Sequence, residues 1–163
     1  MRNIIVLFLL TGIVIVLAGV LGNTHFQTKI PLSLGSEPKK EIKVGEKVIS
    51  VTLADNEAER KNGLSGKTAL DTDSGMLFIF DKKDIYPSFW MKEMLIPIDI
   101  IWINDGKVVK IDKAIEPPEK DLPEGHLTLY YPEKPIDYVL EVNAGFSENN
   151  HVTLGTEVDL SGI

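Results

Sequence analysis

Two acidic side chains interrupt apolar, strand-like segments. Asp99 lies within LIPIDIIWI and Glu141 within YVLEV. A carboxylate removed from water must be paired, accept hydrogen bonds or take up a proton. If Asp99 and Glu141 lay on neighbouring strands with their carboxyl groups about 5–9 Å apart, they could act as the acid and base of a hydrolase, for example on glycans. The structural alternative for Asp99 is an ion pair or the capping of backbone amides, and for Glu141 a solvent-facing or half-buried strand position.

Trp90 and Lys92 lie two residues apart in the segment SFWMKEM. In a strand this spacing places both side chains on one face. An aromatic ring beside a cation and a carboxylate suits a small polar ligand, whereas the neighbouring aromatic residues are expected in the core. The predicted ligand site therefore contains Trp90, Lys92, Asp99 and Glu141. Lys92 is the expected partner of Asp99.

The sequence lacks the residues that several other kinds of functional site require. The sequence contains no cysteine, which excludes a disulfide framework, a thiolate nucleophile and Cys-ligated metals. His25, His126 and His151 show neither HxH nor HExxH spacing, so no metal site is predicted. No serine stands in a nucleophile elbow and no glycine cluster forms a phosphate loop. No cofactor is expected.

Short apolar segments separated by turns must position these residues. Strands are predicted at 47–54, 76–80, 88–94, 98–103, 107–112, 128–131, 136–142, 151–154 and 156–160. The tripeptide NDG at 104–106 predicts a hairpin turn, because Asp and Gly tolerate positive φ. A short helix is expected between Asp55, as its N-cap, and Gly63. This pattern predicts a mainly β fold, a compact antiparallel β-sandwich or barrel-like domain with short helices.

A long apolar segment precedes this domain. Residues 4–21 contain no charge, and only Thr11 among them is polar. A helix of this length spans about 27 Å at about 1.5 Å per residue, close to the thickness of a bilayer core. Arg2 on its N-terminal side favours export of the chain that follows. We expect residues 1–22 to form an uncleaved transmembrane anchor; a cleaved signal helix is the alternative.

The rest of the chain divides into a linker and an acidic domain. Residues 23–45 contain Pro, Gly and Lys without apolar periodicity, which is typical of a linker. Residues 46–163 are then the domain, anchored to the membrane outside the cytoplasm, or secreted after cleavage. They carry 12 Lys or Arg and 22 Asp or Glu, a net charge of −10. Nucleic-acid binding needs clustered cations, so no nucleic-acid partner is expected.

A series of motifs runs through the domain. They are Gly63-Leu64, Asp73-x-Gly75-Met76-Leu77-Phe78 with Phe80, Phe89-Trp90-Met91-Lys92, Pro97-x-Asp99, Leu140-Glu141-x-Asn143-x-Gly145 and Gly155. Over about residues 47–160 they resemble the DUF192 family of small, often exported bacterial and archaeal proteins. The resemblance implies a compact β-rich sandwich with small helical insertions, but no established biochemical function. Ser65 and Glu93-Met94 depart from the family's usual Met and Asn-Thr, which alters any polar site built on those residues.

Two functions follow as hypotheses. The first is a membrane-tethered extracytoplasmic domain that binds a small ligand or an envelope protein without catalysis. The alternative is an envelope hydrolase that uses Asp99 and Glu141 as acid and base near Trp90 and Lys92. A third function, structural support of a membrane complex, would require an exposed apolar patch rather than a pocket.

Overall fold

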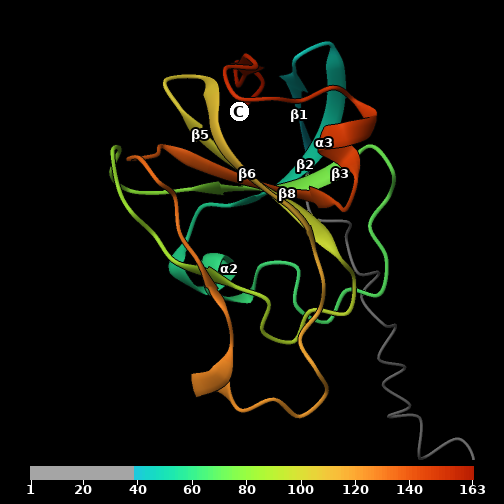
Figure 1. Cartoon of the computed structure of the whole chain (residues 1–163). Helices are drawn as coiled ribbons and strands as arrows, with labels where there is room; N and C mark the ends of the chain where they lie inside the picture. Colours follow the sequence, from blue (N-terminus) through green and yellow to red (C-terminus); the bar gives the residue numbers. More distant parts are fainter. Residues whose placement is uncertain (1–38) are drawn as a thin grey trace, which may run out of the picture. The chain divides into compact units, whose positions relative to one another are not determined.

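The computed structural model describes residues 39–163, whose regular secondary structure is mostly β-strand (Figure 1). The strands are β1 (Lys39–Val44), β2 (Lys47–Ala54), β3 (Ser74–Ile79), β4 (Phe89–Trp90), β5 (Ile98–Asn104), β6 (Lys107–Ile115), β7 (Leu129–Tyr130), β8 (Tyr138–Asn143) and β9 (Val158–Asp159). The helices are α2 (Glu57–Asn62), α3 (Phe146–Asn149) and the 3-10 turn η1 (Glu124–His126). The anchor predicted at 1–22 lies outside the described residues. Within them, no helix combines the length and apolarity needed to cross a bilayer.

Seven strands form one sheet, in the order β6-β5-β8-β3-β2-β1-β9, and β4 pairs with β7 in a separate ribbon. Neighbouring strands of the sheet are antiparallel, except that β2 and β3 are parallel. A parallel pair needs a crossover connection, and the segment containing α2 supplies it. The prediction of a mainly β fold with short helices is confirmed. The fully antiparallel sandwich is not, because the domain is built on a single curled sheet with one parallel pair.

The C-terminal segment connects the two edges of this sheet. At one edge, β9 pairs with β1 through Val158 and Val44. At the other edge, Val108 N donates to Thr156 O at 2.9 Å and Val158 N donates to Gly106 O at 2.8 Å, both at the start of β6. Figure 1 shows this segment crossing the upper end of the sheet, near the C-terminus. The sheet is therefore closed at one end, as in a half-barrel.

Each face of the sheet carries its own core, because successive side chains of a strand point to opposite sides. The inner face, within the curl, buries aliphatic residues that include Val44, Val51, Leu77, Ile101 and Leu140. The outer face buries Met76, Phe78, Ile100, Trp102 and Val139 together with Leu64, Met91 and Met94. Figure 1 shows α2 and α3 on opposite sides of the sheet, α2 on the lower side and α3 on the upper.

The sheet begins earlier in the chain than predicted. Residues 39–44 form β1 and pair along their whole length with β2, so they belong to the sheet and not to the linker that was predicted at 23–45. The buried residues of β1 are Ile42 and Val44, which flank Lys43. Two apolar positions are too few to reveal a strand by periodicity. Pairing with β2 stabilises this segment as a strand.

Three further local predictions need correction. The N-cap of α2 is Asn56, whose Oδ1 accepts from Glu59 N at 3.0 Å, rather than Asp55. The strand expected at 88–94 is reduced to the two residues of β4, which pair with β7. No strand forms at 151–154. The hairpin at 104–106 is confirmed, with positive φ at its second and third residues (47° and 66°).

Candidate functional site

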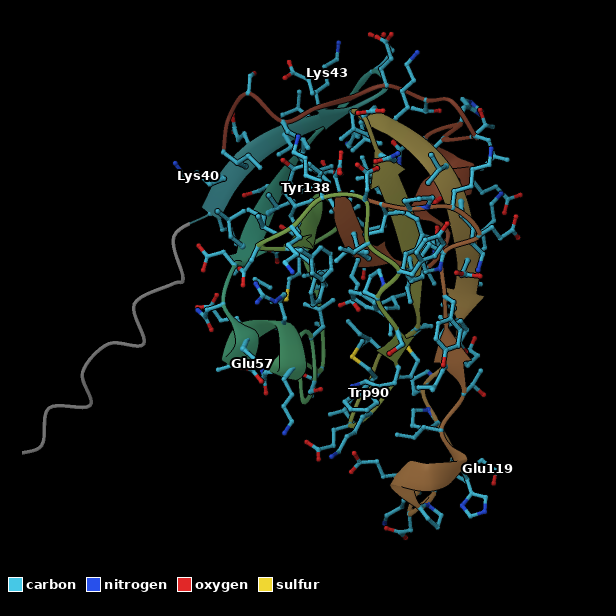
Figure 2. All side chains as sticks on the ribbon, turned by 90° about the vertical axis from the view of Figure 1, so that its left-hand side faces the viewer. Lys40, Lys43, Glu57, Trp90, Glu119 and Tyr138 are labelled. Atoms are coloured by element: carbon cyan, nitrogen blue, oxygen red, sulfur yellow. The ribbon has the colours of Figure 1, made fainter. Side chains whose placement is uncertain are left out.

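Two of the four predicted site residues, Trp90 and Glu141, line one pocket on the outer face of the sheet. We call it the Glu141 pocket; its volume is about 310 Å³. Its walls include the aromatic side chains of Phe78, Phe80, Phe89 and Trp90, and α2 contributes Glu57, Arg60 and Lys61. Figure 2 shows Glu57 and Trp90 in the lower half of the domain, whereas Lys43 lies at the top. The pocket thus combines apolar walls with a few polar groups, as ligand sites do.

One oxygen of the buried Glu141 carboxyl group has no hydrogen-bond partner in the described part of the chain. Its side chain comes from β8 and points to the outer face, opposite Met76 of β3 and Ile100 of β5. Only 4% of Glu141 is exposed, and within residues 39–163 its Oε2 atom has no hydrogen-bond partner. Burial raises the pKa of Glu141 to about 8, because the charged form loses its hydration. At neutral pH the free carboxyl is therefore mostly protonated.

Gly63 keeps open the space beside this carboxyl. It ends α2 with φ 50° and ψ −135°, a conformation that other residues rarely adopt. A Cβ atom at this position would lie 3.7 Å from Glu141 Oε2 and 3.4 Å from Phe78 Cζ. Any side chain at 63 would therefore narrow the pocket next to Glu141. From the sequence, this glycine was predicted to end a helix and was part of a family motif, but it was not predicted to line a site.

Arg60 lines the same pocket, but its guanidinium group is engaged elsewhere. Nη1 donates to the backbone oxygens of Asp55 and Ile79, each at 2.8 Å. The guanidinium carbon lies 5.9 Å from the ring centroid of Phe80, within cation–π range. Arg60 therefore fastens α2 to the end of β3, and does not neutralise Glu141.

Lys92 lies beside Trp90 but does not line the Glu141 pocket. Its Nζ atom is 5.9 Å from the ring centroid of Trp90 and 2.7 Å from Glu124 Oε2. The hydrogen bond to Glu124 raises the pKa of Lys92. Lys92 lines a second groove, of about 710 Å³, beneath the proline-containing segment 117–127. The predicted Lys92–Asp99 pair is wrong; Lys92 instead ties this segment to the residues after β4.

Asp99 is fully buried on the inner face, where it accepts three backbone hydrogen bonds. Oδ1 accepts from Ala114 N at 2.9 Å and from Gly145 N at 3.1 Å, and Oδ2 accepts from Ser147 N at 2.9 Å. These bonds join β5 to the end of β6 and to the start of α3. Asp99 therefore caps backbone amides, as the structural alternative predicted.

Asp99 and Glu141 lie on neighbouring strands but on opposite faces of the sheet. In the register of β5 and β8, Asp99 is opposite Val142 and Glu141 is opposite Ile100. Because side chains alternate, this one-residue offset sends the two carboxyl groups to different sides. They cannot act on one substrate as an acid and base. The hydrolase alternative built on this pair is therefore wrong.

Sequence analysis missed the contribution of α2 and of the residue after it. Arg60 and Gly63 line the pocket because the crossover between β2 and β3 brings α2 beneath the outer face. The only signal in the sequence for these pocket residues was the set of family motifs, because Gly63, Phe78 and Glu141 each belong to one of them. In the described part of the chain, no three His, Asp or Glu side chains are grouped as metal ligands.

Two solved structures resemble this domain. One, from Sinorhizobium meliloti 1021 and described as a candidate transcription regulator, is 26% identical with a TM-score of 0.68, over 78% of this chain and 98% of that chain. The other is a protein of unknown function from Novosphingobium aromaticivorans DSM 12444. It is 26% identical with a TM-score of 0.69, over 78% of this chain and 89% of that chain. No curated protein matches the sequence.

The family comparison agrees with the motifs around the pocket. The model of DUF192, described as an uncharacterized ACR, matches residues 40–160. This range contains nearly all of the curled sheet, both helices and every residue that lines the Glu141 pocket. The matched range is well over half of the chain, and the chain belongs to the DUF192 family.

Proposed function

We propose that the chain is a membrane-tethered extracytoplasmic domain that binds a small ligand in the Glu141 pocket and does not catalyse a reaction on it. The tether is the apolar segment predicted at 1–22, and the ligand site is the pocket between the sheet, α2 and β4. An envelope protein that inserts a side chain into the same pocket would be a ligand of the same kind.

One observation carries this proposal: the unpaired Oε2 atom of Glu141 at an aromatic-walled pocket. Leaving a buried polar atom without a partner costs about 1–3 kcal/mol. A structural role would be expected to provide a partner, as the three amides do for Asp99. A ligand that reaches Glu141 would provide one and would offset this cost on binding.

The absence of catalysis is inferred from the separation of the two carboxyl groups that could have formed an acid and base. Asp99 already accepts three amide hydrogen bonds on the inner face, away from the pocket. The pocket hydroxyl of Ser65 donates to Lys92 O at 2.8 Å, which leaves it no activating base. Binding is therefore the function that this arrangement supports best.

The regulator description of the Sinorhizobium relative suggests DNA binding as a different function. The net charge of −10 on residues 46–163 argues against that function here, because DNA binding depends on neutralising phosphates with Lys and Arg. We therefore favour a small ligand over a nucleic acid.

Ligand binding can be tested through the two tryptophans of the chain. Nuclear magnetic resonance of full-length protein, with ¹⁵N-labelled tryptophan in detergent micelles, should show two indole N–H signals. Trp90 lines the pocket, whereas Trp102 is buried with its Nε1 donating to Asp112 Oδ2 at 2.7 Å, so it serves as the internal reference. Benzylguanidinium, benzylurea, phenylacetate and a mixture of fragments of similar size are added in turn. A saturable shift of the Trp90 signal is expected with at least one probe, and no such shift with any of them would overturn the proposal.

The tether and the location of the domain need a separate experiment. Alkaline phosphatase, which is active only after export, is fused to the C-terminus of the full chain and of a chain beginning at residue 23. The full-length fusion should be active and should sediment with membranes. An inactive full-length fusion would contradict this part of the proposal. So would a fusion beginning at residue 23 that is as active as the full-length fusion.

A further inference from the structure

We propose that the Glu141 pocket recognises an organic cation, a small ligand whose guanidinium or ammonium group forms an ion pair with the Glu141 carboxylate. This inference rests on the proposed function, since it names the chemical class of the ligand for the same pocket. The charged group of the ligand would lie against Glu141, and its apolar part against the aromatic walls.

The first reason is that no cation among residues 39–163 pairs with Glu141. The charged residues that face the pocket are Glu57, Arg60 and Lys61, all on α2. Arg60 donates to two backbone oxygens, and Lys61 is exposed to solvent. The strands that flank Glu141 in the sheet place only apolar side chains opposite it. Burial raises the pKa of Glu141 and none of these cations lowers it, so the positive charge that would pair with the carboxylate is left for a ligand to supply.

The second reason is the chemistry of the walls. Phe78 and Phe89 pack edge to face, with ring centroids 4.8 Å apart, and Trp90 extends this aromatic lining. Aromatic rings attract cations through their quadrupoles, more strongly where water is excluded. The net charge of −10 on residues 46–163 also attracts cations to the domain. A neutral ligand would be served equally well by glutamine at 141, so the presence of glutamate favours a charged one.

Binding such a ligand at neutral pH must release a proton. The free Glu141 carboxyl holds its proton, because burial raises its pKa to about 8. When the cation enters, the O–H bond of the carboxyl breaks, the proton passes to the solvent, and the carboxylate pairs with the ligand. No covalent bond forms to the ligand. By linkage, the affinity should rise about tenfold per pH unit below the pKa of Glu141 and level off above it.

Benzylguanidinium and benzylurea test this inference directly, because they share one shape and differ in charge. A guanidinium group keeps its charge throughout the pH range used here. Isothermal titration calorimetry with the full-length protein in detergent micelles gives both affinities at pH 6, 7 and 9. At pH 9 benzylguanidinium should bind at least about tenfold more tightly than benzylurea, as expected for an added charge-assisted contact. Its affinity should increase about tenfold between pH 6 and 7, whereas that of benzylurea should not increase.

Two variants separate the pocket carboxyl from the general acidity of the domain. Glu141→Gln should lower the affinity for benzylguanidinium by about tenfold or more and remove its pH dependence. Glu57→Gln, at an exposed acidic residue of the same pocket, should keep that dependence. Equal affinities for the two probes, or pH-independent binding of benzylguanidinium, would overturn the inference. If benzylurea or phenylacetate binds without any preference for the cation, the proposed function still stands and only this inference fails; if no probe binds, both fail.

Discussion

Replacing Glu141 with glutamine should stabilise the protein at alkaline pH but not at acidic pH. The carboxyl has a pKa of about 8 in the folded chain and an ordinary value of 4.5 in the unfolded chain. Below pH 4.5 Glu141 is protonated in both the folded and the unfolded chain, so its ionisation does not affect the free energy of unfolding. Between these two values the unfolded chain loses the proton while the folded chain keeps it, so the free energy of unfolding falls as pH rises. Above pH 8 both states are ionised and the cost is constant.

The size of this effect follows from the two pKa values. Each pH unit between 4.5 and 8 lowers the free energy of unfolding by about 1.36 kcal/mol, which amounts to about 5 kcal/mol in total. Glutamine keeps the shape of the side chain without its titration. The stability difference between Glu141→Gln and the parent protein should therefore grow by about 5 kcal/mol from pH 4 to pH 9, a large part of the stability of an ordinary domain.

Urea denaturation of the full-length protein, followed by circular dichroism at pH 4, 6, 7 and 9, measures this difference. Glu133→Gln is the matched control, because Glu133 is exposed and does not line the Glu141 pocket. Its stability difference from the parent should stay constant across the range. A pH-independent difference for Glu141→Gln, within about 0.5 kcal/mol, would mean that the carboxyl is solvated or paired, and would refute the reasoning about the pocket as well.

Three further predictions concern the surroundings of the pocket. Asp99→Asn should destabilise the protein by about 3 kcal/mol, because it leaves buried amides without the carboxylate; a loss below about 0.5 kcal/mol in urea denaturation would contradict this role. Gly63→Ala should cost about 1–3 kcal/mol through backbone strain and should also weaken probe binding, whereas Gly66→Ala, with φ 73° and nothing within 4 Å of its Cβ position, should leave binding intact. An equal loss of binding in both glycine variants would show that the Cβ atom does not enter the pocket. Lys92→Gln should speed hydrogen exchange of the amides in segment 117–127, since it removes the ion pair that holds that segment, while the melting temperature stays unchanged; unaltered exchange would be evidence against this tie.

Local patterns in the sequence were sufficient for most of the strands. Apolar alternation located β2, and short apolar runs bounded by turn residues located β5 and the start of β6, because these signals lie within the strands' own residues. The hairpin between β5 and β6 was equally local, since Asp105 and Gly106 themselves adopt the positive φ that the turn requires.

The assembly of the site depended on contacts between residues that are distant in sequence. Whether Asp99 and Glu141 share a face is decided by the register of β5 against β8, and a shift of one residue would reverse the answer. The parallel pairing of β2 with β3 carries α2 and Gly63 over Glu141, and no local pattern specifies which strands will pair. The sequence by itself therefore determined the strands, the hairpin and the presence of two unusual carboxyl groups. Only the tertiary structure decided that one of them caps amides while the other lies unpaired in a pocket, because strand order and register arise from long-range packing.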